Sequence, residues 1–136
     1  MNDFSGMDDL YRDFILDHYR NPRNAGSIEN ADASFEDINP LCGDKIRMDL
    51  RIRDGVVEDV KFTGRGCAIS QASVSLLTEE IKGKRIADID GIGKDEVLAN
   101  LGISISAARL KCALLGLKVL KQALALKYEA ADEEPA

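Results

Sequence analysis

The sequence predicts an α+β fold in which a small antiparallel sheet of about three strands carries helices on one of its faces. Two observations support this prediction: one hairpin pattern of alternating polar and apolar residues, and helical periodicity in the long segments on either side of it. The chain has 136 residues, of which 45% are hydrophobic and only 5% aromatic. These values fit one domain over residues 1–136 with a mainly aliphatic core.

The first predicted element is a helix over residues 7–20, where apolar side chains recur close to the i, i+3, i+4, i+7 spacing of a helix. Asn21-Pro22 ends the pattern, because the residue before a proline is biased away from the α conformation. The stretch that follows, 24–40, is rich in Asn, Ala, Gly, Asp and Ser. It predicts an extended loop with a short strand around 33–37.

The hairpin gives the clearest pattern in the chain. Residues 45–53 alternate polar and apolar side chains without exception, which is the period of a strand with one buried face. Asp54-Gly55 then provides a two-residue turn, because both positions tolerate positive φ, and the return strand covers 56–63. One hairpin face is apolar and the other is charged, so we expect helices on the apolar side only. We expect the charged face to be exposed to solvent, with a docking surface as the second alternative. It carries Lys45, Arg47, Arg51 and Arg53.

The second half of the chain predicts helices. One covers about 69–82, with Gly83 placed to end it, and a short one covers 94–100 within a glycine-interrupted stretch. A long helix covers 106 to about 128, with apolar residues on two faces. Residues 130–136 offer nothing to bury, and we expect a disordered tail there.

Composition narrows the class of function. The formal charge is −6, from 18 basic and 24 acidic residues, which argues against a general nucleic-acid binder. No apolar run reaches the roughly 20 residues of a membrane span, and the acidic start of the chain lacks the order of a signal peptide. We therefore expect a cytoplasmic protein with neither nucleic acid nor membrane as a partner. The only histidine, His18, falls among polar residues late in the first helix, and we expect it at the surface.

Three cysteines stand out, because an odd number cannot all pair within one chain and a reducing compartment favours metal or thiol chemistry over disulfides. Each lies at an element boundary: Cys42 before the hairpin, Cys67 after its second strand, and Cys112 in the first turns of the last helix. They can therefore meet at one end of the sheet, where Asp44 adds a carboxylate. Taken one at a time, each cysteine is as readily explained as a small buried hydrophobic residue.

Three sulfurs and one oxygen form a four-ligand set that suits zinc or the terminal positions of a [2Fe–2S] cluster. A permanent site normally uses four cysteines, or cysteine with histidine. A single carboxylate is a harder and weaker ligand, and it suggests a site that releases what it binds.

Four ordered segments are more specific. They are 16–24 (LDHYRNPRN), 39–44 (NPLCGD), 64–70 (GRGCAIS) and 109–113 (RLKCA). Together they resemble the U-type iron–sulfur cluster assembly proteins, the family of IscU, SufU and the N-terminal domain of NifU. The resemblance runs from about Leu10 to Leu124.

This resemblance implies a SufE/NifU-like α+β fold and a role in cluster assembly. A cysteine desulfurase of the SufS or IscS type delivers persulfide sulfur, iron is supplied, and a nascent [2Fe–2S] cluster forms before transfer to an apo-protein. Four positions match the iron-, cluster- and metal-binding residues of the family, and in members without iron and sulfur they can hold zinc: Cys42, Asp44, Cys67 and Cys112. Cys42 and Cys112 are the candidate sulfur acceptors.

The site pattern resembles SufU more than IscU. IscU-type members have a histidine immediately before the third cysteine, whereas this chain has Lys111, which we expect to stabilise the neighbouring thiolate or persulfide. Segment 105–109 lacks the prolines that a dedicated Hsp70 chaperone recognises in IscU, so we do not expect that partner. The distance from Cys67 to Cys112 is nevertheless short and lacks the insertion typical of SufU.

We consider three functions. The first is an assembly scaffold, rather than an enzyme, that accepts sulfur, binds iron and a transient cluster, and passes the cluster on. The second is a zinc-dependent sulfurtransferase that stimulates the desulfurase without carrying a cluster, and Lys111 favours it. The third, a structural zinc module, fits least, because a carboxylate is an unusual ligand for a closed structural site.

Overall fold

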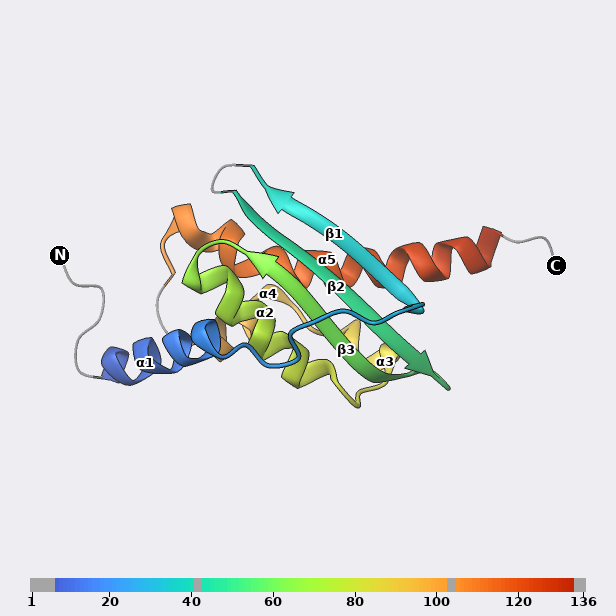
Figure 1. Cartoon of the computed structure of the whole chain (residues 1–136), viewed down its shortest axis with the longest axis horizontal. Coiled ribbons are helices and arrows are strands. Elements are labelled where there is room, and N and C mark those ends of the chain that lie inside the picture. The colour runs from blue at the N-terminus through green and yellow to red at the C-terminus, as the bar shows by residue number, and fades with distance from the viewer. Residues whose placement is uncertain (1–6, 41–42, 103–104, 134–136) are drawn as a thin grey trace.

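The computed structural model describes residues 7–40, 43–102 and 105–133. Within these ranges the chain forms one three-stranded antiparallel sheet, in the order β1-β2-β3, together with helices (Figure 1). The predicted α+β class is thus confirmed. The elements are α1 (Met7–Arg20), β1 (Ala33–Asn39), β2 (Asp44–Arg53), β3 (Val56–Arg65), α2 (Ala68–Ile81), α3 (Ile86–Ile89), α4 (Lys94–Leu101) and α5 (Ala107–Glu133).

The sheet follows the hairpin pattern. Asp54 and Gly55 both have positive φ, at 54° and 75°, and turns of this kind match the twist of the two strands that they join. β1 pairs antiparallel with β2 along its whole length, and the pairing ends at Asn39↔Asp44. The last residue of β1 therefore lies opposite the first residue of β2.

The core lies between one face of the sheet and two helices. α5 packs against β1 and β2, while α2 packs against β3 and α5. Burial of each large aliphatic or aromatic side chain contributes about 1.5–3 kcal/mol to the free energy of unfolding. The apolar contacts of α2 and α5 with the sheet therefore hold it in place. The buried inward side chains of the hairpin are Ile46, Met48, Leu50, Val57, Val60 and Phe62.

α2 is buried almost all round, although it carries many polar side chains. It contacts α1, α4, α5 and β3. Among the described residues, every buried side-chain nitrogen or oxygen has a hydrogen-bond partner, as buried polar groups require. Ser73 Oγ, for example, donates to the Ala113 carbonyl of α5 at 2.6 Å. The buried polar residues of α2 are Ser70, Gln71, Ser73, Ser75 and Thr78.

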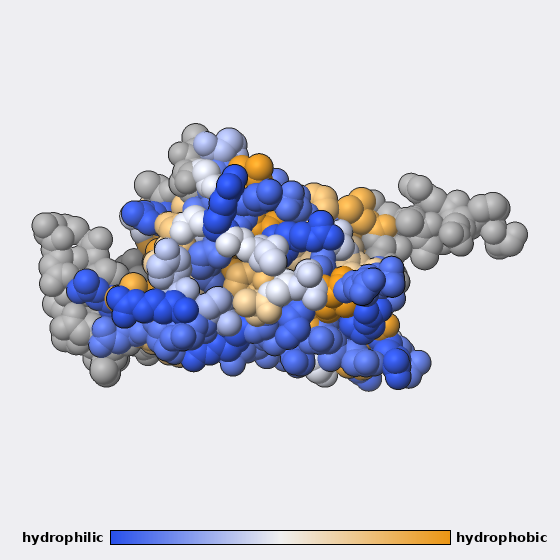
Figure 2. All heavy atoms as spheres, viewed as in Figure 1, coloured by the Kyte–Doolittle hydropathy of each residue, from blue (hydrophilic) through white to orange (hydrophobic). Residues whose placement is uncertain are grey.

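The outer face of the sheet is polar, as predicted, but segment 21–32 covers part of it. Figure 1 shows this segment crossing in front of β3 to reach β1, and Figure 2 shows that the face is mainly hydrophilic. Asp49 accepts hydrogen bonds from this segment and from β1, and it is only 2% exposed. Arg51 donates to two backbone carbonyls of the segment, at 2.8 and 2.9 Å. Arg47 and Arg53 remain exposed.

His18 is buried, and our expectation that it lies at the surface was wrong. Its side chain is 2% exposed, and Nδ1 shares a hydrogen bond with Ser75 Oγ at 2.8 Å. Ser75 Oγ also accepts the backbone N–H of Arg23 at 2.9 Å, and Phe14 packs edge-on against the His18 ring. These contacts attach α1 and the residues after it to α2. Local pattern could not reveal them, because Ser75 lies 57 residues further along the chain.

The helices differ from the prediction in two places. The short helix α3 was not predicted; its Ile89 is fully buried. α5 continues to Glu133 and so takes in residues 130–133 of the segment that we expected to be disordered, because Ala and Glu are strong helix formers. Residues 134–136 lie outside the described residues. No helix in the described ranges is long and apolar enough to cross a membrane.

Acidification should destabilise the fold through His18. Burial lowers the pKa of His18, and the Arg23 cation lowers it further. Glu79 and Asp17 act in the opposite direction. The unfolded chain binds a proton near the ordinary histidine pKa of about 6.5. The contribution of neutral His18 to the free energy of unfolding is therefore fully present above that pH. It declines as the pH falls toward the lowered pKa, by at most about 1.4 kcal/mol per pH unit.

Urea unfolding between neutral and mildly acidic pH measures this effect. His18→Gln, which keeps a polar side chain at the position, should remove this part of the pH dependence while other groups continue to titrate. Identical pH dependence of the wild-type protein and the variant would contradict the prediction.

Candidate metal centre

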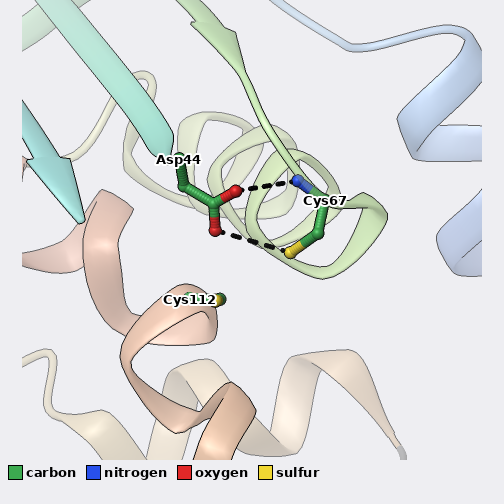
Figure 3. Close-up of side chains that lie close together, drawn as sticks. All are labelled: Asp44, Cys67 and Cys112. Atoms are coloured by element: carbon green, nitrogen blue, oxygen red, sulfur yellow. Dashed lines mark hydrogen bonds between the residues drawn. The ribbon is translucent and has the colours of Figure 1, made fainter. Parts of the chain in front are cut away.

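Three of the four predicted site residues converge at one end of the sheet. Asp44 is the first residue of β2, Cys67 is the N-cap of α2, and Cys112 lies near the start of α5. One oxygen and two sulfurs, one atom from each side chain, all lie within 4.8 Å of one another (Figure 3). The fourth predicted residue, Cys42, lies outside the described residues.

Asp44 is at the centre of this group. It is the first member of the inward row of β2, which continues with Ile46 and Met48, so strand alternation turns its carboxylate toward the interior. Its exposed fraction is 0%. The Cys67 backbone N–H donates to Oδ1 at 2.9 Å, and the Cys67 thiol donates to Oδ2 at 3.5 Å. A buried carboxylate needs such donors, and these bonds tie the start of β2 to the start of α2.

The bend that brings Cys67 to Asp44 requires glycine. Gly66 has a φ of 143°, a conformation that residues with a side chain rarely adopt. A Cβ at position 66 would overlap the Asp44 carboxylate, at 2.6 Å from its Cγ. The glycines were predicted only as part of a bend, and this close approach to Asp44 was not foreseen.

Cys112 is held by the first residue of segment 39–44, and the sequence does not predict this contact. The sulfur belongs to a side chain that is 1% exposed, and the Asn39 Nδ2 amide at the end of β1 donates to it at 3.8 Å. Asn39 is itself 7% exposed. No periodicity or spacing marks this asparagine, because Cys112 lies 73 residues away in the chain.

Lys111 is exposed and faces a groove beside the site. The groove has a volume of about 380 Å³ and lies between the end of β1 and α5. The expected stabilisation of a neighbouring thiolate by Lys111 stays a prediction. The residues that line the groove are Ile38, Asn39, Pro40, Leu110, Lys111, Leu114, Leu115 and Lys118.

The donor set fits zinc or iron. Ligand atoms around one tetrahedral zinc are roughly 3.5–3.8 Å apart, so the oxygen and the two sulfurs, which lie within 4.8 Å of one another, need to close by no more than about 1.3 Å. They would supply three of the four ligands of such a site. His18, the only histidine in the sequence, is bonded to Ser75 and takes no part in this group.

A family model described as the NifU-like N terminal domain matches residues 10–134. The chain belongs to this family.

Individual relatives cover most of the chain. The zinc-dependent sulfurtransferase SufU of Bacillus subtilis is 40% identical over 139 residues, covering 89% of this chain and 93% of the relative. The iron–sulfur cluster assembly scaffold protein IscU of Escherichia coli is 33% identical over 119 residues, covering 85% and 91%.

Solved structures agree with the fold of this NifU-like N-terminal domain. An iron–sulfur cluster assembly scaffold protein described for the SUF system of Fervidobacterium islandicum superposes with a TM-score of 0.72 at 30% identity, covering 88% of this chain and 99% of the other. A NifU-like protein of Brucella abortus gives a TM-score of 0.73 at 23% identity, covering 92% and 99%. At that identity the second likeness supports the fold alone.

Replacing Gly66 with alanine should weaken zinc binding. The added Cβ displaces the Asp44 carboxylate and its two bonds to Cys67, and loss of such support typically reduces metal affinity 10- to 100-fold. Competition with a chromogenic chelator measures the zinc affinity. Gly55→Ala is the matched control, because Gly55 also has positive φ but a Cβ there meets nothing within 4 Å. It should lower fold stability yet leave zinc affinity unchanged, and equal zinc affinities for both variants would contradict the role of Gly66.

Proposed function

We propose that this protein is an iron–sulfur cluster assembly scaffold that accepts sulfur from a cysteine desulfurase, binds iron, and passes a nascent cluster to apo-proteins. The convergence of Asp44, Cys67 and Cys112 at one end of the sheet carries this proposal. Two soft sulfurs and one hard oxygen can hold iron while leaving one ligand easy to displace. Membership of the NifU-like N-terminal domain family, with IscU scaffold proteins among the relatives, supports it.

The ligand set of the proposal is Cys42, Asp44, Cys67 and Cys112, and the cargo is a [2Fe–2S] cluster. Sulfur enters by exchange at a thiolate of Cys42 or Cys112. The thiolate attacks the outer sulfur of the desulfurase persulfide, a new S–S bond forms, and the desulfurase cysteine leaves as a thiolate. Lys111, adjacent to Cys112 in α5, would stabilise a negative persulfide there by its charge.

A zinc-dependent sulfurtransferase is the second candidate. The group of Asp44, Cys67 and Cys112 suits zinc as well as iron, and it contains no histidine among the described residues. The 40% identical relative from Bacillus subtilis is named a zinc-dependent sulfurtransferase. In this case the same residues hold zinc and the protein accepts sulfur without carrying a cluster.

The partners in both cases are a desulfurase of the SufS or IscS type and, for the scaffold, apo-proteins that receive the cluster. We place the protein in the cytoplasm, where such thiols stay reduced. The absence of prolines from segment 105–109 leaves the dedicated Hsp70 chaperone out of the proposal.

Anaerobic reconstitution separates the two candidates. Freshly purified protein is analysed for metal and then incubated with iron, cysteine and a catalytic amount of desulfurase. The scaffold proposal expects stoichiometric iron and sulfide and the visible spectrum of a [2Fe–2S] cluster, and Cys112→Ser should lose both. Tightly held zinc with no cluster, together with faster desulfurase turnover, would replace the scaffold by the sulfurtransferase. If adding the protein leaves desulfurase turnover unchanged, and the protein holds no metal before or after reconstitution, both candidates are wrong.

Asp44→Ala should slow release of the cargo. The carboxylate is a weak ligand, and the Cys67 backbone N–H already donates to its Oδ1 at 2.9 Å. It therefore has a donor to return to when it leaves the metal, and alanine removes that path. Cluster transfer to an apo-ferredoxin, followed by circular dichroism, measures the rate. Asp37→Ala is the control, because Asp37 lies nearby in β1, pairs with Lys118 at 2.9 Å and is outside the ligand group. Transfer at the wild-type rate by Asp44→Ala would contradict the exchange argument.

A further inference from the structure

Asn39, the last residue of β1, contacts the sulfur of Cys112 with its side-chain amide. Its Nδ2 amide donates to Cys112 Sγ at 3.8 Å, and both side chains are buried, at 7% and 1% exposure. We propose that Asn39 is a positioning residue that keeps this N–H···S hydrogen bond when Cys112 binds metal, and so sets how strongly that sulfur donates electrons to zinc or to a cluster. The inference rests on the proposed function and adds a residue to the same site.

The fold holds Asn39 in one place. It is the last residue of β1, opposite Asp44 in the strand register, and its backbone carbonyl accepts the Gly43 N–H at 2.7 Å. The end of β1 is thereby fixed beside the start of β2, so the amide reaches Cys112 without rearrangement.

The chemistry of the two adjacent strand ends is complementary. At the end of β1, a neutral amide donates to one sulfur, while at the start of β2 the Asp44 carboxylate accepts from Cys67. A donor aimed at a metal-bound thiolate withdraws charge from the sulfur, and such outer contacts tune both metal affinity and reduction potential. The amide does not titrate in the ordinary pH range, so its effect is constant where carboxylates and thiols change.

Cobalt and zinc binding test the inference with two variants. Asn39→Leu has a similar volume but no donor, and Asn39→Asp has the same shape but presents acceptor oxygens. Both should move the sulfur-to-cobalt charge-transfer band of the Co²⁺ protein to longer wavelength, because the sulfur becomes richer in electrons. Zinc affinity should fall about 10-fold for leucine, the lower end of the range for outer contacts, because the buried metal-bound thiolate loses a donor that supports its charge.

Asp37→Asn is the matched control. It weakens the neighbouring contact between β1 and α5 without touching a sulfur, so the charge-transfer band and zinc affinity should stay as in the wild type. A band shift in this control equal to that of Asn39→Leu would assign the effect to strand position and overturn the proposal.

The outcomes separate this inference from the proposed function. Wild-type protein that binds neither Co²⁺ nor Zn²⁺ contradicts the metal site itself. Wild-type binding with an unshifted band in folded Asn39→Leu overturns only the role of Asn39. If neither variant folds, the wild-type protein loaded with NMR-active cadmium decides the matter: a scalar coupling between cadmium and the Asn39 side-chain amide proton is expected, and its absence overturns the proposal.

Discussion

The hydrogen bonds between the Asp44 carboxylate and Cys67 are the constraint on which the rest of the site depends. A fully buried carboxylate is costly unless donors surround it, and Cys67 supplies two, its backbone N–H and its thiol. To place these two donors beside Asp44, the chain must turn from β3 into α2 directly beside the start of β2. That turn leaves no room for a side chain at Gly66 and makes Cys67 the N-cap of α2. One buried charge therefore determines where a strand begins, where a glycine is needed and where a helix begins.

The buried polar side chains of α2 explain how α2, which follows Cys67, and α5, which contains Cys112, keep their positions. Ser75 and Thr78 bond to His18 and Asn24, which fastens α1 and the following segment to one side of α2. On another side, Ser73 bonds to the carbonyl of Ala113, the residue directly after Cys112. Small hydroxyl side chains allow close helix packing and also fix its register, because each buried hydroxyl must meet its partner. The positions of Cys67 and Cys112 are thus set by directional bonds as well as by apolar contact.

Features that the sequence predicted are those with a local cause. Strict alternation and the Asp54-Gly55 turn define the hairpin, and the same alternation, extended by one step, turns Asp44 inward. Residues 7–20 and 106–128 follow helical spacing closely enough to locate both long helices. The burial of His18, the contact of Asn39 with Cys112 and the close approach of Gly66 to Asp44 were not predicted. Each depends on a partner at least 22 residues away in the chain, the separation of Gly66 and Asp44, and only folding brings these partners near. Asp49 was similarly hidden: its strand position indicates the solvent face, but segment 21–32 folds over it.

For the scaffold function that we propose, the arrangement of donors and acceptors around the site would let the ligand group both bind a metal or cluster and release it. Asp44 has Cys67 as an alternative partner, and Cys112 has the Asn39 amide. When a metal ion departs, neither anionic group is left buried without a donor, so departure does not carry the full cost of an unpaired buried charge. A site of four cysteines without such neighbours would have no comparable compensation. In the scaffold that we propose, the carboxylate would thus be one part of the means of release, and the hydrogen-bond donors beside the ligands would be the other.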